Sequence, residues 1–182
     1  MGSRPYKFLV DLAPWGVVVE IGSERGEGST AYLRDLCDRC GVPFYTVDIA
    51  PTHPEGVTVA DGATFLRTLT DDVQVAYLDN HDYIFPAIAA EPWIADQAAE
   101  YAARGDLLDN QRSQQVHLEQ AQLVHERSRP GSRIVIDDTY TDGDHLAGKG
   151  ATAVPWLLDH GWRLLSPILT DWETGFAYLA RR

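Results

Sequence analysis

The sequence has only two cysteines among its 182 residues, Cys37 and Cys40. They form a Cys-Asp-Arg-Cys segment within a predicted helix, and no second Cys pair or His pair completes a tetrahedral zinc site. We therefore expect two helix cysteines that have no metal or redox role.

Long apolar segments are also missing. No window holds about 18 uninterrupted apolar residues, so no membrane-spanning helix is expected. The N-terminal segment Met1–Tyr6 lacks the apolar stretch of a secretory signal. These absences predict a cytoplasmic protein with no membrane partner.

Basic charge is scarce as well. Fifteen Lys and Arg face 27 Asp and Glu, which gives a formal net charge of −12. Such a field repels a phosphate backbone, and we see no Lys/Arg cluster that would form a basic groove. The composition therefore predicts that nucleic acid is not a partner.

Short apolar runs alternate with helical patterns along the chain. This alternation predicts an α/β fold with a mostly parallel sheet covered on both faces, in a single domain over residues 1–182. A short connection joins the last two strands, which makes that pair antiparallel. The expected strands are 17–21, 43–48, 57–60, 73–78, 132–136, 162–168 and 175–180, and the expected helices are 31–40, 62–69, 113–129 and 151–160.

The predicted parallel strands each end in Gly or Asp. Gly22, Asp48, Asp61, Asp79 and the pair Asp137-Asp138 follow successive strands. Ligands of open α/β sheets bind at the carboxyl ends of strands, so these residues predict a binding crevice. The alternative is that the acids serve only as caps and turns.

Three glycines, Gly22, Gly26 and Gly28, follow the first strand and allow a close approach of backbone to ligand. Their spacing does not fit the G-x-G-x-x-G fingerprint of nicotinamide-dependent oxidoreductases, which makes that class the less favoured alternative. After the next two strands, Asp48 can accept the two ribose hydroxyls of an adenosine, and Asp61 can reach the adenine amine.

The segment Glu20–Thr30 (EIGSERGEGST) resembles motif I of class I methyltransferases that use S-adenosylmethionine (SAM), in the form found in small-molecule O-methyltransferases. Tyr45–Asp48 resembles the family's ribose-binding acid motif. The resemblance implies a Rossmann-like three-layer sandwich whose seven-stranded sheet has an antiparallel last strand. It also implies a SAM site. Its residues would be Glu20, Gly22, Ser23, Gly26, Gly28, Ser29, Asp48, Asp61, Gly62 and Asp79.

Two further segments, Val75–Asp79 and Ile134–Asp138, resemble the metal-bearing segments of cation-dependent O-methyltransferases. The resemblance implies Mg²⁺ held by Asp79, Asp137 and Asp138, which would lower the pKa of an acceptor hydroxyl. The chain departs from the catechol type at Asp82, where that type has a lysine. These acids could equally orient backbone amides or bind substrate without a metal, so both alternatives stay open.

Candidate general bases are His81, His145 and Lys149. Residues 80–111 form a long irregular segment, which we interpret as a substrate lid; short helices of the core or of a dimer interface are the alternative. The function predicted is methyl transfer to a hydroxyl of a small-molecule acceptor, in a protein that could form a homodimer. Metal-independent transfer to nitrogen, carbon or carboxylate, and SAM binding without catalysis, are the other hypotheses.

Overall fold

A computed structural model describes residues 5–9, 12, 15–23, 26, 28–51, 55–170 and 175–182. Its centre is a seven-stranded sheet in the order β3-β2-β1-β4-β5-β9-β8. The neighbours from β3 to β5 pair in parallel, whereas β9 runs antiparallel to both β5 and β8. The strands are β1 (Val17–Ile21), β2 (Phe44–Asp48), β3 (Thr58–Val59), β4 (Val73–Leu78), β5 (Arg133–Asp137), β8 (Trp162–Leu164) and β9 (Phe176–Arg181). The predicted α/β fold with its antiparallel last strand is therefore confirmed.

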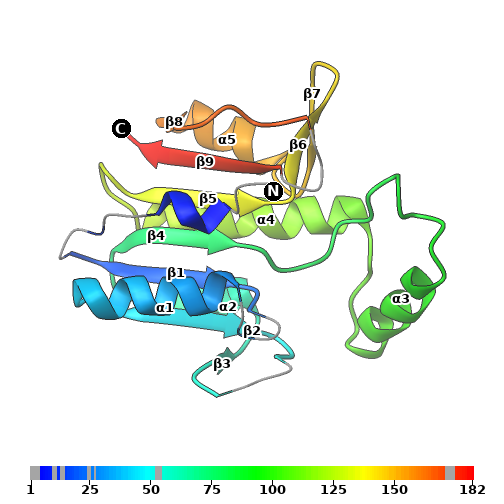
Figure 1. Cartoon of the computed structure of the whole chain (residues 1–182), viewed down its shortest axis with the longest axis horizontal. Helices are drawn as coiled ribbons and strands as arrows, with labels where there is room; N and C mark the ends of the chain where they lie inside the picture. The colour runs from blue at the N-terminus through cyan, green and yellow to red at the C-terminus, as the bar shows by residue number, and fades with distance from the viewer. Residues whose placement is uncertain are drawn as a thin grey trace.

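Helices cover both faces of the sheet (Figure 1). On one face lie the 3-10 helix η1 (Pro5–Phe8) and α1 (Ser29–Cys40), and on the other lie α2 (Gly62–Thr68), α4 (Asn110–Glu126) and α5 (Ala153–Asp159). The strand side chains alternate between the two resulting cores: Val19 and Ile21 pack with Leu66 and Val124, while Val18 packs with Leu33.

The structure differs from the sequence prediction in two segments. The predicted irregular stretch 80–111 contains a helix, α3 (Trp93–Ala103), which begins after Pro92 and is rich in alanine. The loop expected after the fifth strand folds into a hairpin of β6 (Thr139–Asp142) and β7 (His145–Gly148), closed by Gly143 at φ 59°. Its Thr-Tyr-Thr run followed by Asp-Gly is a hairpin signal that the prediction did not use.

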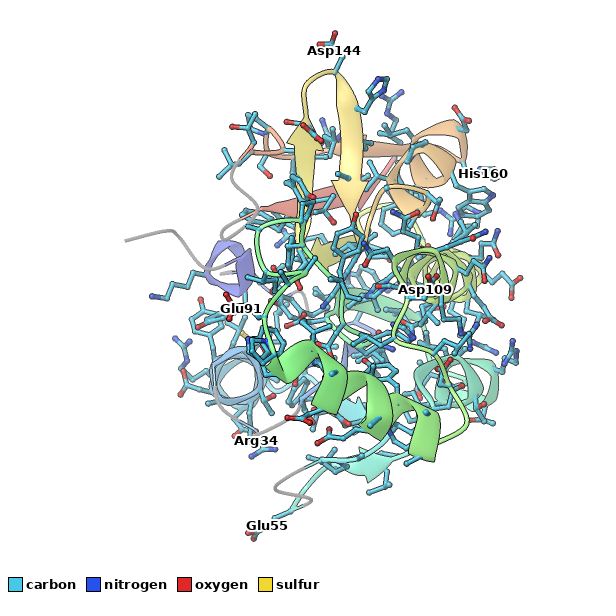
Figure 2. The ribbon with its side chains drawn as sticks, turned by 90° about the vertical axis from the view of Figure 1, so that its right-hand side faces the viewer. Arg34, Glu55, Glu91, Asp109, Asp144 and His160 are labelled. Atoms are coloured by element: carbon cyan, nitrogen blue, oxygen red, sulfur yellow. The ribbon has the colours of Figure 1, made fainter. Side chains whose placement is uncertain are left out.

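Both unexpected elements lie beyond the same edge of the sheet. In Figure 1 the arrowheads of β1, β4 and β5 point toward α3 and the β6–β7 hairpin. Figure 2 looks onto this edge, with α3 crossing in front and Asp144 at the tip of the hairpin. The elements that sequence patterning missed therefore flank the predicted binding crevice.

Within the described part of the chain, the helices are all too short or too polar to cross a bilayer.

Candidate functional site

Strand register places the predicted site residues at one level. Ile21 lies opposite Val47 in β2 and Leu78 in β4, and Leu78 lies opposite Ile136 in β5. The next residue of each strand therefore reaches the same edge, and these residues are Gly22, Asp48, Asp79 and Asp137.

Gly22 follows β1 and lies against the backbone that follows β4. Its N–H donates to the carbonyl of Val47 over 2.8 Å, and its φ is 95°. A Cβ at this position would lie 2.5 Å from the carbonyl oxygen of Asp79 and 2.6 Å from the amide nitrogen of Asn80. Only glycine fits here, because both the backbone conformation and the space exclude a side chain.

The Asp48 carboxylate ties the end of β2 to the turn after β1. One oxygen, Oδ2, accepts the backbone N–H of Ser23 over 2.9 Å, and Oδ1 accepts that of Ala50 over 2.8 Å. A carboxylate has about four acceptor positions in all. Asp48 is thus oriented by backbone groups at the place predicted for a ribose-binding acid.

Glu20 is fully buried beneath the N-terminus of α1. Its Oε2 accepts the Thr46 hydroxyl over 2.9 Å, whereas Oε1 has no hydrogen-bond partner among the described residues. Burial raises the pKa of Glu20 to about 7, and nearby hydroxyls, those of Ser29 and Thr30 among them, only partly oppose this rise. A buried carboxyl oxygen without a donor is a group that a ligand can satisfy.

The rest of the Gly-rich turn is described in part. Ser23 is buried and its hydroxyl has no partner among the described residues. Gly26 and Gly28 have φ of 68° and 59°, and Gly28 directly precedes α1, which begins at Ser29. Residues 24, 25 and 27 of the matched motif lie outside the described residues. The turn brings the Ser23 backbone to the Asp48 carboxylate, and the cofactor-binding roles of these residues stay predictions.

Asp61 and Gly62 form the start of α2. The Asp61 carboxylate accepts the Thr64 N–H over 2.8 Å and so caps the N-terminus of α2. Helix capping is the alternative to ligand binding that was given for these acids. A Cβ on Gly62 would lie 2.3 Å from Ile21 Cγ2 and 2.8 Å from the Gln120 amide nitrogen. Gly62 therefore permits close packing of α2 on β1 and α4, and its predicted place on the adenine side stays a prediction.

A lysine bridges two of the three predicted metal ligands. The Lys149 ammonium lies 2.8 Å from Asp79 Oδ1 and 2.9 Å from Asp138 Oδ2, with its side chain 3% exposed. Burial alone would lower the pKa of Lys149, but the carboxylates of Asp138 and Asp79 raise it well above its usual value. Lys149 therefore stays protonated at neutral pH and does not suit the predicted role of a general base.

The third predicted ligand, Asp137, is bonded to a tyrosine. It accepts the Tyr77 hydroxyl, while its Oδ1 accepts the Asp138 N–H over 3.0 Å. Burial, followed by the charges of Asp79 and Asp138, raises the pKa of Asp137 to about 8. No group of three or more acidic, His or Cys side chains that could hold a metal exists in the described portion. With Lys149 between two of the three acids, this set does not fit a divalent cation.

His81 serves as an anchor for the segment that contains α3. Its ring packs edge-on against Tyr101 at 4.9 Å, and its carbonyl accepts the Ser113 hydroxyl over 2.9 Å. Burial lowers the pKa of His81. The neighbouring Asp82, which stands where the catechol type has lysine, accepts hydrogen bonds from Gln97 and Tyr101 of α3. These residues thus hold α3 against the end of β4.

His145, the third candidate base, is exposed at the start of β7 and pairs with Asp142 across the hairpin. An aromatic cluster instead joins the hairpin to the lid segment. Tyr83 and Phe85 have ring centroids 6.5 and 5.9 Å from that of Tyr140 in β6. Phe85 and Tyr140 are buried, so this cluster forms an apolar wall beside Asp137 and Asp138.

Asn110, at the start of α4, fixes the beginning of the lid segment. Its Oδ1 accepts the Ile84 N–H over 2.7 Å, and its Nδ2 donates to the Ile84 carbonyl over 2.9 Å. In Asn110→Ala we expect residues 80–111 to open more often, because each lost bond contributes about 1 kcal/mol. Limited proteolysis should cleave this segment roughly tenfold faster, while the global melting temperature shifts little. Unchanged cleavage would show that Asn110 does not hold the segment. Gln111→Ala, on the exposed neighbouring residue, is the control.

Sequence reasoning missed several residues of this site. The sequence pattern predicts a core position for Tyr77, because this residue lies on a buried strand. His117 is fully buried, and burial followed by the Lys149 charge lowers its pKa to about 3. Gly148 and Gly150 flank Lys149. The Gly-Lys-Gly sequence could have drawn attention to this segment, because lysine is rare in the chain and is otherwise found only at position 7.

Comparisons with known proteins give a match at the level of fold. No family model and no curated sequence matches the chain. Among solved structures, a Streptococcus mutans protein assigned as a methyltransferase and crystallised with SAH is 15% identical, with a TM-score of 0.58 and complete coverage of both chains. An rRNA methylase from Streptococcus thermophilus is 13% identical, with a TM-score of 0.54 over 100% of this chain and 98% of that one. A methyltransferase homologue from Pyrococcus horikoshii is 14% identical, with a TM-score of 0.60 over 96% and 64% of the two chains.

These likenesses and the strand order together define the class: the chain has the Rossmann-like fold of class I SAM-dependent methyltransferases. Because one neighbour is an rRNA methylase, the fold does not support the predicted exclusion of nucleic acid, which then depends on the net charge and on the lack of a Lys/Arg cluster in the sequence. Fold does not by itself specify the reaction.

Proposed function

We propose that this protein transfers the methyl group of SAM to a hydroxyl of a small-molecule acceptor. The observation that carries the proposal is the convergence of Asp48, Ser23 and buried Glu20 around the turn after β1. Asp48 holds the Ser23 backbone in place, and the Glu20 and Ser23 side chains each keep a buried oxygen without a partner among the described residues. Such a turn suits a ligand with one adenosine end and one charged amino-acid end.

The residues around Asp48 support an adenosine orientation. Asp48 would accept the ribose hydroxyls, and Gly22 and Gly26 would lie along the methionine part. Ile49 and Val59 are 56% and 61% exposed, so an adenine ring placed between β2 and the start of α2 would cover apolar side chains that water now contacts. Asp61 and Gly62 border the same side.

The acceptor would bind between the lid segment and the β6–β7 hairpin. The wall made by Tyr83, Phe85 and Tyr140 suits a flat or apolar molecule, and residues 80–111 would close over it. We expect the binding energy to come from these rings and the orientation from the carboxylates at the strand ends.

In the reaction SAM supplies an electrophilic methyl group. The acceptor oxygen forms a bond to that methyl carbon as the carbon–sulfur bond breaks, so the hydroxyl must lose its proton. Asp79, next to Gly22 and with its side chain 33% exposed, would take it; burial raises the pKa of Asp79, although the charge of Lys149 opposes this rise. The protein's main contribution would be the alignment of the oxygen with the methyl group.

The first test is a calorimetric titration with SAM of the wild-type protein and Asp48→Ala. We expect saturable binding that weakens by roughly 1–3 kcal/mol, or about 5- to 150-fold, in the variant. Asp38→Ala, on the exposed side of α1, should bind as the wild type does. Absence of saturable heat in folded wild-type protein would overturn the proposal.

The second test follows methyl transfer itself. The protein, labelled SAM and a panel of phenols and other alcohols are incubated, and methylated products are detected by mass spectrometry. Tight SAM binding with no transfer to any hydroxyl, but transfer to an amine or carboxylate, would reject the O-methyl part alone. SAM binding with no transfer at all would favour the non-catalytic hypothesis.

A further inference from the structure

Lys149 occupies the position between the strand ends at which the resemblance places a divalent cation. Its ammonium is within 3 Å of one oxygen from each of Asp79 and Asp138. These two acids follow neighbouring parallel strands, β4 and β5, and their side chains are about one-third exposed while the lysine lies buried beneath them. One ammonium therefore offsets one of the two carboxylate charges from inside the protein.

The backbone around Lys149 is built to hold it there. The Lys149 N–H donates to the Asp138 carbonyl over 2.9 Å, and the Gly150 N–H donates to the Thr139 hydroxyl over 3.1 Å. A Cβ on Gly148, whose φ is 81°, would lie 1.9 Å from the Asp138 carbonyl oxygen, and one on Gly150 would lie 2.5 Å from the Thr139 hydroxyl. Glycines on both sides thus let the hairpin return close enough for the lysine to reach the strand ends.

The start of α4 contacts the segment around Lys149 from another side. The Gln114 side chain donates to the Gly148 carbonyl over 3.2 Å, and the Thr152 hydroxyl donates to the Gln114 carbonyl over 3.0 Å. The lysine is therefore fixed by the hairpin, α4 and both strand ends, rather than by a flexible surface contact.

We propose that the Lys149 ammonium is a built-in replacement for a divalent cation, so that Asp79 and Asp138 bind no Mg²⁺ in this protein. A divalent ion at these acids would have to displace a buried ammonium or lie beside it, and like charges at such distances repel strongly. Lys149 acts here as a positioning residue, because it holds the carboxylates at the place where the acceptor hydroxyl would bind.

The proposal makes the acid pair a latent metal site. Removal of the lysine charge leaves two carboxylates on adjacent strand ends with an unoccupied space between them. Oxygen ligands of this kind suit Mg²⁺ and Mn²⁺, so a neutral residue at position 149 should create a metal site where the wild type has none. This part does not depend on the proposed methyl transfer, because metal binding is measured without SAM.

The experiment titrates Mn²⁺ into wild-type protein, Lys149→Met and Lys7→Met, with bound Mn²⁺ measured by electron paramagnetic resonance. Lys7 is the only other lysine and is exposed, so its variant is the matched control. We expect Lys149→Met to bind one Mn²⁺ about tenfold or more tighter than the wild type and the control. The gain should disappear in the double variant Asp79→Asn, Lys149→Met.

A second measurement covers the case in which Lys149→Met is poorly folded. Thermal melting followed by circular dichroism should show Mn²⁺ raising the melting temperature of Lys149→Met but not that of the wild type. If the variant does not fold even with Mn²⁺, Mn²⁺ binding to the wild-type protein tests the proposal. Mn²⁺ binding to the wild type that is lost in Asp79→Asn would overturn the proposal, and no such binding would support it. The separate SAM titration of the wild type shows whether the proposed function has failed instead.

Discussion

Replacement of Gly22 by alanine should cost about 2–6 kcal/mol of folding free energy. A non-glycine residue at φ 95° costs about 1–3 kcal/mol in backbone strain. In addition, the new Cβ would lie 2.5–2.6 Å from the Asp79 carbonyl group and the Asn80 nitrogen, and such overpacking adds about 1–3 kcal/mol. These atoms are backbone, so the end of β1 would have to move away from β4. Denaturant unfolding measures the loss.

Gly26→Ala is the matched control for Gly22→Ala. It belongs to the same Gly-rich turn and also has a positive φ of 68°, but no atom of the described residues lies within 4 Å of the Cβ that the substitution would add. We expect a loss of about 1 kcal/mol from the left-handed conformation alone. Equal losses in both variants would show that crowding between β1 and β4 does not limit position 22.

Glu20→Gln should remove a large part of the pH dependence of folding stability. The pKa of Glu20 rises from 4.5 to about 7 on folding because the carboxyl group is buried, so the folded state prefers the protonated form. The stabilisation is complete below about pH 4.5 and is lost as the pH rises through 7. This difference in pKa corresponds to about 3 kcal/mol. A glutamine cannot ionise, so its variant should lack this fall.

The measurement is chemical denaturation of both proteins between pH 4.5 and 8.5, which compares the free energy of unfolding at each pH. Subtraction of the two curves cancels other titrating groups, Asp137 with its pKa of about 8 among them. Glu100→Gln, on an exposed part of α3, controls for the loss of one acidic group. A constant difference between wild type and Glu20→Gln across this range would mean that Glu20 has the same pKa in the folded and unfolded chain.

Glu20 and Lys149 illustrate two different ways in which this site uses buried charge. Glu20 has a buried oxygen without a partner among the described residues, and its burial raises its pKa. Lys149 has two carboxylates as partners.

Local patterning was enough to predict the α/β class and the position of the sheet strands. The mostly apolar runs at 17–21 and 73–78 correspond residue for residue to β1 and β4, because parallel strands buried on both faces are rich in apolar residues. The Gly or Asp after each strand could also be placed at one edge of the sheet, because the carboxyl ends of parallel strands meet there.

Patterning failed where long-range contacts decide the structure. The α3 segment is held by Asp82 and Asn110, which lie on its two flanks, and no local period records such contacts. The hairpin after β5 has a local signal in Asp142-Gly143, but its importance is that it returns Lys149 to Asp138, 11 residues earlier in the chain.

The sequence by itself determined the sheet, the Gly-rich turn and the row of acids at the strand ends, since these follow from burial periodicity and from the backbone freedom of glycine. Only the tertiary structure decided what the acids do. Asp61 caps a helix, Asp48 holds a turn, and Asp79 and Asp138 hold a lysine. The physical reason is that a carboxylate takes the role of whichever donor or cation the fold brings to it, and that partner is distant in sequence.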